Sequence, residues 1–68
     1  IMQSDWMPLN KFPGYAYTPE GNVVRIAKNN VLKKHQRQHY AVVFIIKNYH
    51  TWTVRLDELQ KEFEEYSK

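Results

Sequence analysis

The chain has 68 residues, of which 43% are hydrophobic and 15% aromatic, and it contains no cysteine. This length allows one domain, 1–68, and excludes a second. Without cysteine, the chain can form neither a disulfide scaffold nor a thiolate metal site. Its longest apolar run, 41–46, is far shorter than the roughly 18 residues of a membrane span, and no signal-peptide pattern opens the sequence. We therefore expect a cytoplasmic protein without a membrane partner.

The net charge of +3 is distributed unevenly along the chain. Residues 1–22 carry a net charge of −1, residues 23–55 carry +7 with no acidic side chain, and residues 56–68 carry −3. A partner senses the local field rather than the total charge, so the basic middle segment favours a polyanionic partner. A cluster of solvated cations that binds nothing would produce the same pattern.

The first third of the chain predicts an extended arm followed by a β-hairpin. The arm, 1–13, contains two prolines, which disfavour a helix, and its apolar side chains show no helical period. We expect these side chains to lie on a core. Residues 15–18 and 23–27 have the composition of strands, and the turn residues 19–22 separate them.

The middle of the chain predicts a polar loop followed by a central strand. Residues 33–39 are entirely polar, which is typical of a loop or of a solvated extension of a strand. Residues 40–47 are apolar on both alternating sides, so this strand should be central and at least partly covered on both faces. A turn at 47–50 leads to 51–56, where Trp, Val and Leu alternate with Thr and Arg.

The C-terminal segment predicts a helix over 57–66. Asp57 can cap its first turn, with Gln60 as the capping-box partner. One apolar stripe runs along it, formed by Leu56, Leu59, Phe63 and Tyr66. A lone helix this short is marginal in water, so it must pack on the sheet formed by 15–56. The predicted fold is α+β: a small three- to five-stranded, mainly antiparallel sheet with one C-terminal helix packed on one face.

The same alternation predicts which charges face solvent. Arg25, Thr53 and Arg55 should share the open face of the sheet, because their neighbours in sequence have the core parity. The outward side of the helix should carry Glu58, Glu62 and Glu65, on the side away from that open face.

The sequence indicates neither a catalytic nor a metal site. The serines, Ser4 and Ser67, lie near the ends of the chain and lack the context of a nucleophile. Two glycines are too few for a phosphate-binding loop. His35, His39 and His50 supply fewer than the four ligands of a closed zinc site. We expect no enzymatic activity, no cofactor and no metal.

The charges favour binding to duplex DNA. Arginines on an open sheet face could reach base edges, and cations in loops and turns could reach phosphates. A two-stranded ribbon or a small sheet face fits the major groove, which is roughly 12 Å wide. The predicted DNA-binding residues are Arg25, Lys28, Lys33, Lys34, His35, Arg37, Lys47 and Arg55.

Several short motifs follow one another along most of the chain. Residues 6–25 contain Trp-Met-Pro-Leu, then Phe-Pro-Gly-Tyr-Ala-Tyr-Thr-Pro-Glu-Gly-Asn-Val-Val-Arg. Val-Leu-Lys-Lys follows at 31–34, Tyr-Ala-Val-Val-Phe at 40–44 and Thr-Trp-Thr-Val-Arg-Leu at 51–56. Over about 5–56, this order resembles the nuclease-associated modular DNA-binding domain (NUMOD-type) of phage and intron-encoded HNH homing endonucleases.

The sequence also departs from that family pattern. Thr18-Pro19 stands where the family has Ser-Asn, Lys34 is not followed by proline, and the junction at 51–56 lacks the family's histidine. No HNH motif follows. The resemblance therefore implies a DNA-binding accessory module, or a small phage or prophage protein built from one, without the cleavage activity.

A protein-interaction module is the alternative that the sequence leaves open. It would be a phage-type inhibitor of a host protein or a chromodomain-like peptide reader. Tyr15, Tyr17, Tyr49 and Trp52 could line an aromatic cage for a methylated lysine. The same aromatic side chains equally supply the bulk that a small core needs.

Overall fold

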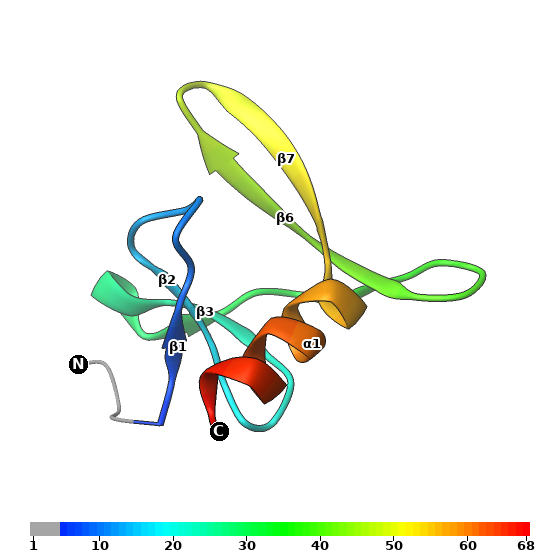
Figure 1. Cartoon of the computed structure of the whole chain (residues 1–68). Helices are drawn as coiled ribbons and strands as arrows, with labels where there is room; N and C mark the ends of the chain where they lie inside the picture. The colour runs from blue at the N-terminus through cyan, green and yellow to red at the C-terminus, as the bar shows by residue number, and fades with distance from the viewer. Residues whose placement is uncertain (1–4) are drawn as a thin grey trace.

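The computed structural model describes residues 5–68; the first four residues of the predicted arm lie outside this range. The chain forms two antiparallel sheets and one C-terminal helix, which confirms the predicted α+β class (Figure 1). The first sheet has the order β1-β2-β3-β4, with strands Met7–Pro8, Tyr15–Tyr17, Val23–Arg25 and Asn30–Val31. The second has the order β5-β6-β7, with strands His35–Gln36, Ala41–Lys47 and His50–Arg55. A short 3-10 helix, η1 (Ile26–Lys28), and the helix α1 (Leu56–Tyr66) complete the fold.

The β2–β3 hairpin forms around a compact turn. The Thr18 N–H donates to the Asn22 carbonyl at 2.9 Å, and the Thr18 hydroxyl oxygen accepts the Asn22 N–H at 3.2 Å. Gly21 within this turn has φ +86°, a conformation that costs residues with a Cβ. The turn sets the register in which Ala16 lies opposite Val24. In this register both faces of the hairpin are covered by apolar side chains: Val23 is buried on one face, and Ala16 and Val24 are buried on the other.

The β6–β7 hairpin is the longest pairing in the molecule. Asn48 and Tyr49 form its two-residue turn with φ of 54° and 62°. Two successive left-handed residues make a type I′ turn, whose twist matches that of the paired strands. The short strand β5 pairs only with Ala41 and Val42. Beyond that point the hairpin is a two-stranded ribbon that extends away from the rest of the molecule (Figure 1).

The central position of β6 and its partial cover on both faces follow the prediction from sequence. Val42 and Val43 are buried on opposite faces of the strand. Toward the turn only the inner face stays covered: Ile45 is 1% exposed, whereas its neighbour Ile46 is 70% exposed. The cover on the outer face therefore ends where the sheet narrows to a ribbon.

The helix α1 begins at Leu56, one residue before the predicted start. The predicted capping box is wrong, because Asp57 lies inside the first turn and Arg55 occupies the position before the helix, without a side-chain cap. The Asp57 carboxylate instead accepts two hydrogen bonds from the Arg55 guanidinium. The chain passes directly from β7 into α1, so no residue remains to form a separate cap. In the described part of the chain, no helix is long and apolar enough to cross a membrane.

One main core cluster joins both sheets and the helix. Its buried members are Met7, Leu9, Tyr17, Val23, Val43, Ile45, Leu56 and Leu59. On the other side of the first sheet, Trp6, Ala16 and Val24 form a second, smaller cluster. The aromatic ring of Phe63 lies 5.5 Å from that of Tyr17, so the predicted helical stripe does pack on the sheet. Tyr66, the last residue of that stripe, is about half exposed.

Replacing Ile45 with valine tests this division of β6 into a covered and an open side. We expect Ile45→Val to lower the free energy of unfolding by about 0.5–1.5 kcal/mol, because it opens a small void in the core. The matched change Ile46→Val on the exposed side should alter it by less than about 0.5 kcal/mol. Urea denaturation followed by circular dichroism measures both values. Equal destabilisation of the two variants would contradict the assignment of faces.

Candidate nucleic-acid interface

The outer face of the second sheet carries aromatic and cationic side chains next to one another. Residues that lie opposite one another in antiparallel strands share a face, and the register pairs His35 with Val42, Val42 with Arg55, and Phe44 with Thr53. Val43 and Ile45 point to the core, so these residues point the other way. We call this surface the basic–aromatic face; its residues are His35, Arg37, Tyr40, Phe44, Thr53 and Arg55.

Three close contacts organise the basic–aromatic face. The Cζ of Arg55 lies 3.9 Å from the ring centroid of Tyr40, and the Cζ of Arg37 lies 5.8 Å from that of Phe44. The His35 ring lies 4.7 Å from the Phe44 ring. A cation above an exposed ring gains about 0.5–1 kcal/mol, enough to favour one position of the side chain. Val42 lies buried on this same face.

Among residues 5–68, Asp57 supplies the one carboxylate that forms an ion pair with a residue of the basic–aromatic face. Its two oxygens accept hydrogen bonds from the Nε and Nη2 of Arg55, at 3.1 and 2.7 Å. The hydrogen bond from Arg55 lowers the pKa of Asp57, and the same bond raises the pKa of Arg55. The bidentate contact holds the guanidinium plane in a fixed orientation at the junction of β7 and α1.

The structure brings some of the predicted DNA-binding residues together and separates others. His35, Arg37 and Arg55 lie on the basic–aromatic face. Lys33 and Lys34 are exposed in the connection that leads into β5.

The other three predicted residues lie elsewhere. Arg25 is exposed on β3 of the first sheet, and Lys28 is exposed at the end of η1. Lys47 points to the inner side of the hairpin, where its Nζ donates to the Lys11 carbonyl at 2.7 Å. That ammonium also lies 5.7 Å from the ring centroid of Phe12.

The expected open face shared by Arg25 and Arg55 does not exist, because the two arginines belong to different sheets. The first sheet is moreover covered on both faces: Val23 belongs to the main core, and Val24 packs with Trp6 and Ala16. Parity along a strand predicts which residues share a face of that strand. It does not predict which strands share a sheet.

Sequence reasoning does not assign Tyr40 and Phe44 to the candidate site. Both lie on the same side of β6 as Val42 and Ile46, and the apolar character of the whole strand favours a core position for them. Both residues occupy even-numbered positions of the strand, and they lie in sequence between the basic segment 33–37 and Arg55. This pattern is the sequence signal that could have assigned them to the site.

The four aromatic residues of the alternative cage do not gather at one place. Tyr17 is buried against Phe63, Tyr49 is fully exposed at the turn of the β6–β7 hairpin, and Trp52 lies on the inner side of β7. Nor do three or more His, Asp or Glu side chains of residues 5–68 gather as a metal site.

The Arg55–Asp57 contact predicts a measurable change in acid titration. We expect Arg55→Gln to raise the pKa of Asp57 toward its ordinary value of 3.8, because the variant lacks the charged hydrogen-bond donor. In the native chain the lowered pKa means that this contact stabilises the fold above about pH 4, and the stabilisation disappears as the pH falls through the pKa of Asp57. Carboxyl chemical shifts measured by NMR during titration report the value. An unchanged pKa of Asp57 in Arg55→Gln would contradict this contact.

Comparison with known proteins finds no relative: no family model, no curated protein and no solved structure matches the chain. The resemblance to the NUMOD-type domain therefore stays a prediction.

Proposed function

We propose that this protein binds duplex DNA, without catalysing a reaction, through the basic–aromatic face and the adjacent lysines Lys33 and Lys34. The observation that supports this function best is the sheet face, exposed around the buried Val42, on which Arg37 and Arg55 lie over aromatic rings. Residues 23–55 contain no acidic side chain, so nothing within the second sheet itself repels a phosphate backbone.

The shape of the second sheet is compatible with the major groove. Neighbouring strands are separated by about 4.8 Å, so a two-stranded ribbon with its side chains fits a groove roughly 12 Å wide. The turn end of the ribbon formed by β6 and β7 projects beyond the helix and the first sheet (Figure 1). Its outer face carries Phe44, Ile46, Thr51 and Thr53. Apolar side chains can contact thymine methyl groups, and threonine hydroxyls can bond base edges.

The cations lie at the base of this ribbon, where they can contact the phosphates on either side of the groove. Lys33 and Lys34 precede β5, Arg37 follows it, and Arg55 ends β7. Contacts to phosphates position a protein on the duplex, whereas contacts to base edges select the sequence. In this proposal the base of the ribbon therefore contributes affinity and its outer face contributes sequence preference.

The resemblance to a NUMOD-type domain supports the same proposal, because that family supplies DNA contacts to phage and intron-encoded nucleases. We extend the proposal accordingly to a small phage or prophage protein, or a module of one, that acts in the cytoplasm. The alternative, a protein-interaction module, is favoured by a different surface: an open groove between α1 and β7, which Trp52, Val54 and Glu62 help to line.

The salt dependence of duplex binding tests the proposal. We expect affinity to fall steeply with salt. Lys33→Gln/Lys34→Gln should reduce the log–log salt slope by about 0.9 for each phosphate that the variant no longer neutralises. Arg37→Gln should weaken binding to all sequences in the same way. Fluorescence anisotropy of a labelled duplex at several salt concentrations gives the slopes.

A matched control comes from Lys61, an exposed lysine on α1. Lys61→Gln removes the same charge from the molecule as a single substitution in the 33–34 pair, but it does so on the acidic helix α1 and not on the second sheet or in the connection that leads into β5. It should leave the salt slope unchanged. The absence of duplex binding at low salt, or an equal effect of Lys61→Gln and Lys33→Gln, would contradict the proposed interface.

A further inference from the structure

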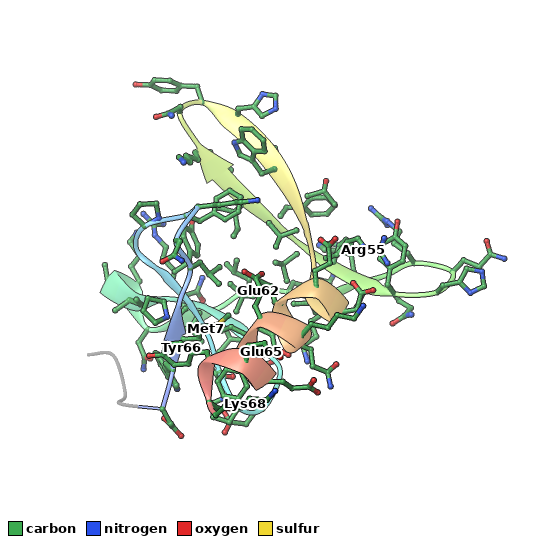
Figure 2. The ribbon with its side chains drawn as sticks, in the orientation of Figure 1. Met7, Arg55, Glu62, Glu65, Tyr66 and Lys68 are labelled. Carbon is green, nitrogen blue, oxygen red and sulfur yellow. The ribbon has the colours of Figure 1, made fainter. Side chains whose placement is uncertain are left out.

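A large open groove lies along β7, where Trp52 and Val54 of the inner side line it together with Thr53 and Arg55. Three walls bound it: β7, the segment from β1 to Phe12, and α1. Its volume is about 1040 Å³, slightly above the roughly 300–1,000 Å³ typical of small-ligand sites, so it can hold a short stretch of polypeptide. Figure 2 labels five of the lining residues: Met7, Arg55, Glu62, Glu65 and Tyr66.

Part of the groove lining is apolar and preformed. Trp52 is 46% exposed, a large fraction for a tryptophan on the inner side of a hairpin. Its ring meets that of Phe12 edge-on, with the centroids 6.2 Å apart. Val54 and Leu59 continue the apolar lining toward the helix. An apolar side chain entering here would bury the exposed part of Trp52 without any rearrangement of the core.

The β7 wall of the groove is an unpaired sheet edge, because β7 is the last strand of the second sheet. The two-residue turn makes Lys47 and His50 a hydrogen-bonded pair, and in an antiparallel ladder such pairs alternate with non-bonded ones. The backbone groups of Trp52 and Val54 therefore bond to β6, whereas the N–H and C=O of Thr53 point away from it. The backbone N–H and C=O groups that point outward along this edge can therefore bond to an added strand.

The opposite wall is a weaker edge for pairing. β1 is also the last strand of its sheet, but Pro8 has no N–H to donate. A polypeptide in the groove would thus form its backbone hydrogen bonds with β7, and β1 would only confine it.

The helical wall of the groove carries negative charge, whereas the cationic lining residues, Lys11, Lys47 and Arg55, come from the other sides of the groove. Glu58, Glu62 and Glu65 of α1 line the helical wall. Glu65 pairs with Lys68 at 3.2 Å, an exposed contact. In residues 5–68, neither Glu58 nor Glu62 has a cationic group within 4.0 Å. The wall that faces the β7 edge therefore favours a lysine or arginine side chain of the occupant.

We propose that this groove binds an extended, basic segment of a partner protein, which adds as a strand to the free edge of β7. An apolar side chain of the segment packs on Trp52 and Phe12, and a lysine or arginine contacts Glu58 and Glu62. Main-chain hydrogen bonds give such a complex its affinity, and alternate side chains give it its specificity. The site uses the inner side and the free edge of β7, and it shares only Thr53 and Arg55 with the proposed DNA interface.

The test is selection of a random peptide library displayed on phage against the whole chain. We expect the enriched peptides to alternate apolar with basic residues. Selected peptides are then synthesised and titrated into the labelled protein, with amide chemical shifts as the readout. The shifts should map to Thr53, Val54 and the first turns of α1. Failure to enrich any peptide, or enrichment of acidic ones, would overturn the proposal.

Two sets of variants separate charge recognition from strand pairing. Glu58→Gln/Glu62→Gln should weaken binding about two- to fivefold or more, the range of exposed ion pairs. The matched control Glu64→Gln should have no effect, because Glu64 lies beside Tyr17 on another side of the helix, where it adds to the effect of burial in raising the pKa of Tyr17. Equal effects of the two changes would contradict the acidic wall as the contact.

Strand pairing is tested on the peptide, so that no substitution can unfold the protein. N-methylation of one alternating set of peptide amides should weaken binding at least about tenfold, because it removes several hydrogen bonds to β7. N-methylation of the other set should have little effect. Equal tolerance of both sets would overturn the added-strand geometry. Concentration-dependent dimerisation of the free protein, abolished in Glu58→Gln/Glu62→Gln, would instead assign the groove to a second copy of the chain.

Discussion

The burial of Val43 and Ile45 on the inner face of β6 is the contact on which the rest of the structure depends. Both side chains belong to the cluster that also contains Leu56 and Leu59 of the helix and Val23 of the first sheet. In a chain of 68 residues, no other described cluster joins both sheets and the helix. Because α1 covers only one face of the second sheet, the outer face stays exposed beyond the buried Val42, and both candidate surfaces follow from this uneven cover.

The strand β7 takes part in both candidate surfaces because its two sides and its free edge have different surroundings. Thr53 and Arg55 point outward, to the basic–aromatic face, whereas Trp52 and Val54 point inward, to the groove. Arg55 stands at the junction of the two surfaces, where Asp57 holds its guanidinium. The two candidate surfaces therefore meet at this single side chain.

Local sequence patterns predicted the individual elements well. The turn at 47–50, the strands on either side and the helix predicted over 57–66 all lie within one residue of where they were expected. These elements depend on neighbouring residues: a strand on its alternation, a helix on its apolar stripe. The capping box at Asp57 failed because the helix begins one residue earlier, at Leu56, so Asp57 lies inside the first turn and its carboxylate pairs with Arg55. Sequence spacing alone does not fix the first residue of a helix to within one position.

The sequence by itself determined the α+β class, the antiparallel pairing, the C-terminal helix and the separation of a basic middle from an acidic end. Only the tertiary structure decided that the strands divide into two sheets, so that Arg25 and Arg55 lie apart while Tyr40 and Phe44 lie beside the arginines of the second sheet. Alternation along a strand specifies two sides, but it does not specify which side the rest of the chain will cover. That choice depends on how the first sheet and α1 share one small core, which is a property of the whole chain.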